Sequence, residues 1–437
     1  MCGILGSCLV SCCASIVCTA CCKVGRLQST GTKLCYAFFL LLSFLLALAM
    51  LGTQVQEFVN ENLAEKLWFD KGSTISDELV GTLSVTRIMT ASIAFHAILS
   101  VSVAGVNDTQ SNRAAIHNGL WCFKFLAWVG LICLMFVLPN GIFQGLSSTV
   151  YRGGGCLFLL ISIIHLVDFV YQFYRRVYID RGDQDTEGGA WMCLVMVITF
   201  GCYAWTVFVT VTAVVVHSDG EGCGEGLAAV FLGLALTIVV SCLSVSPWVR
   251  NAANGMGQTN GIFQASVVSA YCSFLALSAM QNHPEMRCRI VKTDDVDFWL
   301  KMLGVLFVCV TVSFTAIERG TEDHAVPPLP GMEGMESEEG ELEDDEKHGV
   351  KYAYWYFHLH MLLAAMYLCM LLTGWDTIEG SNNTLVLDRT MVSVWIKILT
   401  SWICYVLYAV TLILPPLFPD RQFGSPPEGG AQVAVGA

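Results

Sequence analysis

Five ionisable side chains lie within or beside long apolar runs of the sequence, where a charged group is costly. They are His117 and Lys124, then His165 and Asp168, and finally Lys397. Spacings of seven and three residues put both members of each pair on one face of a helix. An ionisable residue inside a membrane span costs a few kcal/mol and marks a candidate functional site. These residues therefore suggest a polar track that attracts charged groups, rather than a catalytic centre.

A reading without function stays open for the same residues. Lys124 and Lys397 can extend their ammonium groups to the membrane surface, while His165 and Asp168 can simply pair with neighbouring groups. The sequence contains no nucleophile elbow, Walker loop, HExxH or kinase motif. We therefore expect no enzyme activity, no catalytic residues and no cofactor.

Two closely spaced histidines near the end of the chain raise the question of a metal site. His358 and His360 lie two residues apart, so they point to different faces of a helix, and a zinc site needs more ligands than two. We expect no metal there. The neighbouring aromatic residues are more typical of a belt at the membrane surface: Tyr352, Tyr354, Trp355 and Tyr356.

Cysteine is frequent, with twenty residues in the chain and eight of them in the first 35 positions. The cysteine pairs at 12–13 and 21–22 could ligate zinc. No histidine accompanies them, so plain packing or palmitoylation is favoured. Cys223 and Cys288 fall in loops that we place outside the cell interior, where conditions are oxidising. The sequence does not decide between a disulfide that joins these two cysteines and two free thiols.

The elements that must carry these residues are membrane-spanning helices. Hydrophobic residues make up 55% of the chain and charged residues 14%, whereas a soluble protein has about 25% charged residues. Each apolar run is close to the roughly 20 residues that cross a bilayer. We expect an all-α polytopic membrane protein of about ten helices, with an eleventh at 3–22 left open. The predicted spans, with Pro139, Pro247, Pro284 and Pro415 at their edges, are 35–53, 86–106, 119–138, 153–177, 190–216, 226–246, 262–280, 297–317, 353–373 and 391–414.

The distribution of charge predicts the orientation of the chain. The net charge is −13, but twelve acidic residues lie between Glu318 and Glu346, so the acidity belongs mainly to one loop. The sequence has no basic patch of the kind that binds nucleic acid, so we expect no nucleic-acid partner. With the N-terminus in the cytosol, twelve Lys and Arg residues lie in inside loops and seven in outside loops, which favours both termini in the cytosol. Asn382 in an Asn-Asn-Thr acceptor then lies outside and predicts a glycan, whereas Asn107 lies inside and should stay unmodified.

The same pattern divides the chain into five parts. The acidic loop is rich in Gly, Pro, Glu and Asp, and it has too little apolar surface to order itself. The expected parts are a cysteine-rich N-terminal segment at 1–34, the first eight helices at 35–317, an acidic disordered cytosolic loop at 318–351, the last two helices at 352–416, and a flexible tail at 417–437.

Several segments, in order along nearly the whole chain, resemble the serine incorporator (Serinc, or TDE/TMS) family. The outside loop at 54–84 and the acidic loop carry no such resemblance. The matching segments are NRAAIHNG at 112–119 with Trp121 and FKF at 123–125, IHLVDF at 164–169, NGIFQASVV at 260–268, YWYFH at 354–358, MYL at 366–368, MLLT at 370–373, WIK at 395–397 and LFPDR at 417–421.

The resemblance implies ten helices in two bundles with long tilted helices crossing between them, and a role in membrane lipids. It points to phosphatidylserine and sphingolipid synthesis and to phospholipid scrambling without ATP, so the polar track would serve lipid headgroups. One alternative is a scaffold that delivers serine to separate lipid synthases, with the acidic loop as partner surface. Another is a secondary transporter, which should show paired broken helices in two halves. Expected partners are membrane phospholipids, with serine, synthases and a homo-oligomer left open, in an endomembrane or the plasma membrane.

Overall fold

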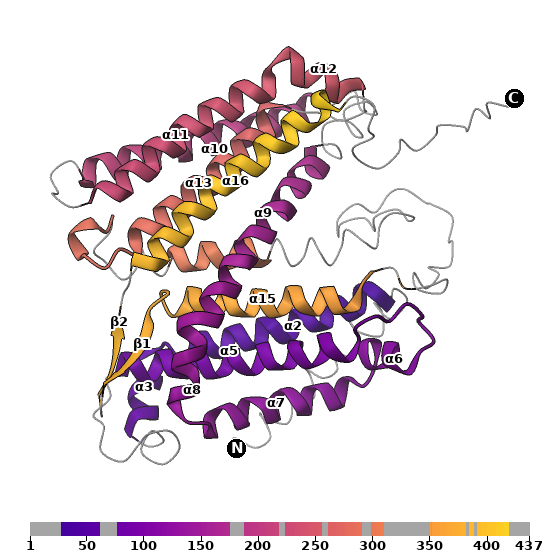
Figure 1. The fold of residues 1–437 in the computed structure, drawn as a ribbon, viewed down its shortest axis with the longest axis vertical. Helices are drawn as coiled ribbons and strands as arrows, with labels where there is room; N and C mark the ends of the chain where they lie inside the picture. The colour runs from indigo at the N-terminus through magenta and orange to yellow at the C-terminus, as the bar shows by residue number, and fades with distance from the viewer. Residues whose placement is uncertain are drawn as a thin grey trace, which may run out of the picture. The chain divides into compact units, whose positions relative to one another are not determined.

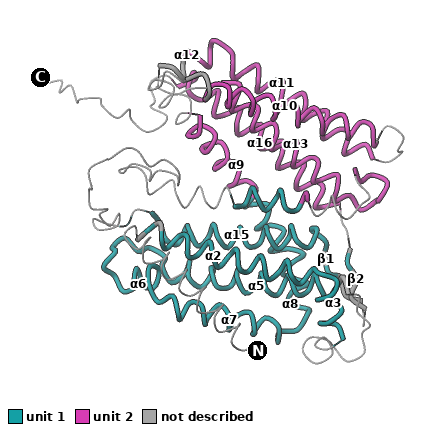
Figure 2. Tube along the Cα trace, turned by 180° about the vertical axis from the view of Figure 1, so that it is seen from behind, with its two compact units in different colours: residues 1–158, 301–388 teal, residues 159–300, 389–437 magenta. Residues whose placement is uncertain are grey.

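The computed structural model describes residues 28–61, 77–174, 188–217, 223–255, 261–290, 299–309, 350, 352–381, 384–388 and 391–418. The chain forms two compact units, each made of two segments that are distant in the sequence (Figure 2). Unit 1 contains residues 1–158 and 301–388, and unit 2 contains residues 159–300 and 389–437. The two bundles expected from the resemblance therefore correspond to two units, with the chain passing from one to the other inside a helix.

Unit 1 is built around two helices with mostly buried residues, α5 (Asp77–Ser102) and α15 (Tyr354–Leu372), which pack against each other (Figure 1). Helices α2 and α7 pack on α5, and a β-hairpin packs on its start through Ile378 and Leu387. The other elements are α2 (Gln28–Ala49), α3 (Thr53–Val59), α6 (Asn112–Asn118), α7 (Trp121–Val137), α8 (Asn140–Gly145), the π-helix η2 (Leu146–Tyr151), β1 (Thr377–Ser381) and β2 (Thr384–Asp388). The strands pair antiparallel, from Thr377 opposite Asp388 to Ser381 opposite Thr384.

At the centre of unit 2 lies one almost fully buried helix, α13 (Ile262–Gln281). It packs against α10, α11 and α16. Its outer helices expose large apolar side chains, as expected for a surface that faces lipid. The elements are α10 (Gly188–His217), α11 (Gly224–Val245), α12 (Pro247–Gly255), η4 (Met286–Cys288) and α16 (Met391–Leu417). Helix α9 (Arg152–Tyr174) belongs to unit 1 up to Phe158 and to unit 2 from Leu159 onward.

Each of the ten predicted spans overlaps a helix in the described residues. Eight helices there are long and apolar enough to cross a membrane, or nine if the bent pair α6–α7 counts as one span. The predicted span at 297–317 is described only as a helix at Trp299–Cys309. An all-α polytopic membrane protein is therefore confirmed, with the small hairpin as an addition. The cysteine-rich start, most of the acidic loop and the tail beyond Phe418 lie outside the described residues.

Several helix ends differ from the predicted ones because polar residues continue a helix that hydropathy alone would stop. Helix α5 begins at Asp77 rather than 86, and the hydroxyls of Ser84 and Thr86 bond the carbonyls four residues earlier at 2.7 and 2.8 Å. A hydroxyl satisfied in this way can be buried within its own helix. Similarly, the helical segment that leads into α9 already begins at Asn140 instead of 153.

Proline is also tolerated where a helix end was predicted. Helix α16 continues through Pro415 and Pro416 to Leu417, although the predicted span ends at 414. Prolines in the last turn remove few intrahelical bonds, and Phe418 N still donates to Leu414 O at 3.1 Å. Pro139 and Pro247, by contrast, lie at helix starts as predicted.

A buried arginine holds the end of α7 in place. Arg87 on α5 is fully buried and donates to the carbonyls of Met135 and Leu138, the latter at 2.8 Å, and to Asn140 Oδ1 at 2.5 Å. Its guanidinium also lies 4.4 Å from the centre of the Phe143 ring. The last carbonyls of a helix lack intrahelical partners, and Arg87 supplies donors to two of them inside an apolar bundle.

We predict that Arg87→Leu destabilises the protein by about 2–4 kcal/mol, because buried carbonyls lose a charged donor that water cannot replace. Arg113→Leu is the matched control. The exposed Arg113 bonds the carbonyls of Ser102 and Ala104 in the same manner, but water can replace it there, so the loss should stay below about 1 kcal/mol. Thermal unfolding of detergent-purified protein measures both, and equal losses would show that burial is not the cause.

Candidate functional site in unit 1

A break between two helices creates the most polar part of the interior of unit 1. Helix α6 starts at the cap Ser111, whose side chain accepts from Ala114 N at 3.1 Å. It ends after seven residues, and Leu120 adopts a left-handed backbone with φ 60° before α7 begins. The two helix axes differ by 70°. The break leaves the last carbonyls of α6 without intrahelical partners at the point where the chain turns inward.

The His117 carbonyl at this break accepts two hydrogen bonds. Lys124 Nζ donates to it at 2.7 Å, and the Tyr36 hydroxyl of α2 donates at 2.9 Å. The Lys124 ammonium also lies 3.9 Å from the ring centre of Trp121. Lys124 is only 5% exposed, and within the described part of the chain no carboxylate pairs with it. Its charge therefore rests on a neutral carbonyl and two aromatic faces, a weak compensation for a buried cation.

The His117 imidazole belongs to a row of buried rings. Its Nδ1 lies 3.0 Å from His358 Nε2, and its Nε2 lies 2.8 Å from the Tyr352 hydroxyl. On the far side of His358, Nδ1 lies 3.2 Å from His96 Nδ1. All three imidazoles are fully buried and Tyr352 nearly so. The His117 ring also stacks on Tyr354 with centres 4.0 Å apart, which fixes its orientation.

The predicted track residues thus fall into two groups. His117 and Lys124 meet in unit 1, although not on one helix face as expected, because the 70° break between α6 and α7 separates them. His165, Asp168 and Lys397 all lie in unit 2. Lys397 is buried and donates to Ser278 Oγ at 2.8 Å and to Ser278 O at 3.3 Å, so it does not extend to the surface. Asp168 is exposed on α9 and His165 is half-buried.

The aromatic residues that open α15 do not form a surface belt as a group. Tyr352 and Tyr354 are buried at 5% and 1% exposure, whereas Trp355 is exposed. The expected belt is therefore wrong for the two tyrosines, whose hydroxyls reach His117 and Asn118. Their polar tips satisfy the helix break instead of the membrane surface.

The two histidines of α15 point to different sides, as their spacing predicts. His358 joins the row of imidazoles, and the His360 ring lies 5.4 Å from that of Phe158. In the described part of the chain, no group of three or more His, Cys, Asp or Glu side chains has an arrangement that could hold a metal ion.

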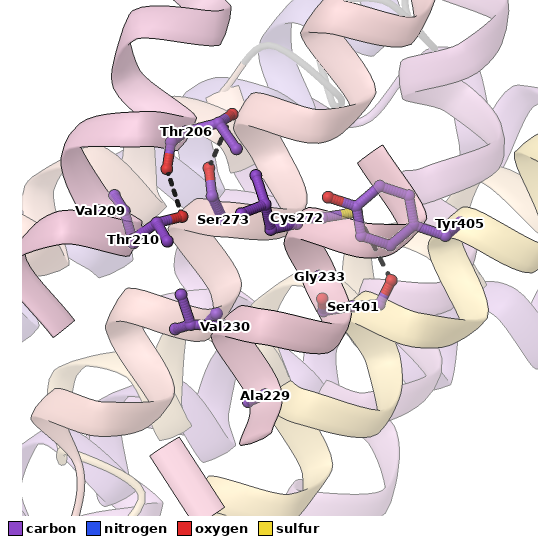
Figure 3. A pocket seen from close by; sticks show the side chains of 12 residues that line it. Thr206, Val209, Thr210, Ala229, Val230, Gly233, Cys272, Ser273, Ser401 and Tyr405 are labelled. Carbon is purple, nitrogen blue, oxygen red and sulfur yellow. Dashed lines mark hydrogen bonds between the residues drawn. The ribbon is translucent and has the colours of Figure 1, made fainter. Parts of the chain in front are cut away.

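Unit 2 contains a small cavity lined by neutral groups (Figure 3). Neutral polar groups line it. Thr206 Oγ1 lies 3.4 Å from Ser273 Oγ, and the Cys272 thiol sulfur lies 3.5 Å from the backbone carbonyl oxygen of Ser401. The cavity has about 10 Å³ of room for a water-sized group, roughly enough for one water. No charged side chain lines it, and a space for about one water is too small for free serine. Its lining residues are Thr206, Val209, Thr210, Ala229, Val230, Gly233, Leu234, Cys272, Ser273, Ala276, Ser401 and Tyr405.

A disulfide joins Cys223 at the start of α11 to Cys288 in η4, with Cα atoms 5.5 Å apart. This is the pair that the sequence left open between a disulfide and free thiols. Both residues are buried at the same end of unit 2. Asn382 and the cysteine pairs at 12–13 and 21–22 lie outside the described residues.

Three members of the site in unit 1 were missed from the sequence. His96 lies inside a predicted span, so the cost of an ionisable group in a membrane could have drawn attention to it. Lys33 lies just outside a predicted span, and its Nζ is 4.1 Å from the centre of the Tyr352 ring. Tyr36 carried no signal, because tyrosine is common in membrane helices.

The fold and this site define a polytopic helical membrane protein with buried bases at a helix break. The sequence profile described as "Serine incorporator (Serinc)" matches residues 7–334 and 321–421. The chain therefore belongs to the serine incorporator family. It is similar to "Membrane protein TMS1" of Saccharomyces cerevisiae, with 28% identity covering 95% of each chain. It is also similar to "Serine incorporator 2" of Mus musculus, with 29% identity covering 96% of this chain and 99% of the relative.

We predict that Cys223→Ser with Cys288→Ser lowers the stability of unit 2 by up to about 4 kcal/mol. The disulfide closes a loop with a sequence separation of 65, and the loss of that cross-link returns chain entropy to the unfolded state. The control is Cys193→Ser with Cys242→Ser, two exposed free cysteines. Thermal unfolding without reductant should separate the two double variants, and an unchanged midpoint for the first pair would contradict the prediction.

Proposed function

We propose that this protein handles membrane lipids by letting phospholipid headgroups cross the bilayer in both directions, without ATP and without covalent chemistry. The supporting observation is the buried Lys124 at the break between α6 and α7. Its one hydrogen bond in the described residues goes to a neutral carbonyl. A lipid phosphate would replace that carbonyl with an anion, and charge-assisted hydrogen bonds are roughly twice as strong as neutral ones.

Asp168, exposed on α9 in unit 2, is a separate candidate group. Moving a headgroup into hydrocarbon is costly because polar groups leave water. A fixed group of opposite charge lowers that cost, so Lys124 in unit 1 can attract a phosphate and Asp168 in unit 2 can attract an amine. The access to Lys124 is narrow, because its side chain is buried. Transfer at this site therefore requires the α6–α7 break to open.

Two alternatives receive less support from the described residues. A scaffold that delivers serine suits the names of relatives such as "Serine incorporator 2", but the cavity in unit 2 is too small for serine and has no charged side chain. A secondary transporter calls for matched broken helices in two halves. In the described part of the chain one helix pair, α6–α7, is sharply bent.

We predict that Lys124→Leu and Asp168→Leu each slow lipid exchange by about tenfold or more. A hydrogen bond to a charged group contributes about 1.5–3 kcal/mol, and roughly 1.4 kcal/mol corresponds to tenfold in rate. Purified protein in liposomes with fluorescent phospholipids measures the exchange, with a membrane-impermeant quencher added outside. Glu225→Leu is the control, since Glu225 is a half-buried acid in the first turn of α11 and has no place in the proposed transfer.

The outcomes separate the proposals. If wild-type protein moves no lipid, the translocator is excluded and the scaffold is favoured. If wild type moves lipid but both variants keep full activity, lipid transfer stands and Lys124 and Asp168 are not its residues. Circular dichroism of each variant shows whether it remains folded.

We also propose that both termini face the cytosol, in an endomembrane or the plasma membrane. The charge bias of the loops supports this orientation. The disulfide between Cys223 and Cys288 supports it independently, because disulfides persist in oxidising compartments and both cysteines fall on the side assigned to the outside.

We predict a glycan on Asn382 and none on Asn107 when the protein is made in a eukaryotic host. The two acceptors lie on opposite sides of the membrane in this orientation. Glycosidase should increase the gel mobility of wild type and of Asn107→Gln but leave Asn382→Gln unchanged. A shift abolished by Asn107→Gln instead would reverse the orientation.

A further inference from the structure

The row of imidazoles in unit 1 forms an unbroken chain of hydrogen bonds from one end to the other. It runs from His96 to His358 at 3.2 Å, from His358 to His117 at 3.0 Å, and from His117 to Tyr352 at 2.8 Å. Three separate parts of the sequence supply these residues, namely α5, α6, and α15 with the residues directly before it. His117 and His358 use both ring nitrogens in this row of hydrogen bonds, whereas the buried His96 Nε2 has no hydrogen-bond partner among the described residues.

Proton counting shows what such a chain can do. An uncharged imidazole carries one proton and offers one donor and one acceptor. If Tyr352 donates to His117, then His117 donates to His358, His358 donates to His96, and His96 Nε2 keeps a proton. In the reverse arrangement His96 Nδ1 donates to His358, which donates to His117, and His117 donates to the Tyr352 oxygen. His96 Nε2 then carries no proton. One proton taken from water at the Tyr352 oxygen and one given up to water at His96 Nε2, when water reaches these two ends, converts the first arrangement into the second.

The surroundings hold the rings in line for such transfer. Tyr354 stacks on His117, and the Tyr36 ring meets His358 edge to face with centres 4.6 Å apart. Among the described residues, the charged and titratable groups around this row of rings are basic or phenolic apart from one thiol: Lys33, Cys35 and Tyr36 on α2, Lys124 on α7, Tyr352 just before α15, and Tyr354 at its start. Lys124 Nζ bonds the backbone carbonyl of His117 rather than its ring, so the ring nitrogens stay available to the chain.

We propose that His96, His358 and His117 form a proton relay that begins at the Tyr352 hydroxyl and ends at His96 Nε2. The relay binds and passes protons, an activity separate from any movement of lipid. A purely structural network would instead keep each ring in one fixed tautomer. The difference is measurable, because a relay moves protons between the two nitrogens of each ring.

Solid-state ¹⁵N NMR of histidine-labelled protein in lipid nanodiscs tests the relay. The three rings are assigned from His96→Gln, His117→Gln and His358→Gln. In wild type we expect the Nδ1 and Nε2 signals of each ring to exchange with one another on warming. Tyr352→Phe removes only the terminal hydroxyl and should slow the exchange at His117 and His358 by at least about tenfold. His360→Gln is the matched control. His360 is also buried, on the same helix as His358, but it takes no part in the row of hydrogen-bonded imidazoles, so its replacement should leave the exchange unchanged.

Separate, non-exchanging nitrogen signals for the three rings of folded wild-type protein would overturn the relay. So would exchange that persists at the same rate in Tyr352→Phe. If Tyr352→Phe fails to fold, His96→Gln provides the same test from the opposite end, since it removes the exit atom and should slow the exchange at His358 and His117. Lipid exchange measured on the same samples keeps this result separate from the proposed lipid transfer.

Discussion

The need to satisfy buried polar groups within the protein governs much of this structure. In hydrocarbon, water cannot bond an unpaired donor or acceptor, so each one must find a partner in the chain. Arg87 meets this need for the end of α7, and the Lys124 and Tyr36 side chains meet it for the end of α6. Ser84 and Thr86 meet it within their own helix. Helix breaks that would be unstable in lipid persist because a buried side chain reaches each one.

The two units solve the same problem with different chemistry. Unit 1 uses bases, with Arg87, Lys124 and the three imidazoles bonding carbonyls or one another. Unit 2 relies largely on neutral hydroxyls around α13, such as Thr237 with Tyr405 at 2.8 Å, and Lys397 there bonds a serine. Neutral pairs cost little to bury and seldom carry function, whereas buried bases without an acid keep some capacity to bind an anion or a proton. Unit 1 is therefore the better place for chemistry.

The sequence predicted the approximate position of the spans because apolar length is a local property, although eight or nine helices of the described residues, rather than ten, are long enough to cross a membrane. It placed His117 and Lys124 on one face of a single helix, but a 70° break separates them, and they meet only because Lys124 reaches back to the His117 carbonyl. It could not predict that His358 would join them, because 241 positions separate His358 from His117 and no periodicity links different helices. The early start of α5 was missed for a different reason: hydropathy counts Ser84 and Thr86 as polar, although their hydroxyls are already bonded inside the helix. Arg87 and His96 lay within a predicted span and were the signals that could have revealed a polar interior.

The geometry at the α6–α7 break constrains how lipid transfer and proton transfer could coexist. Lys124 and the relay both use His117, but through different atoms. Lys124 bonds the backbone carbonyl of His117, whereas the relay uses its ring nitrogens. A phosphate that draws Lys124 away would leave the carbonyl with the Tyr36 hydroxyl as its remaining donor. The stack of His117 on Tyr354 does not depend on Lys124, so the ring can keep its place while the ammonium moves. The break can therefore open for a headgroup without dismantling the row of imidazoles behind it.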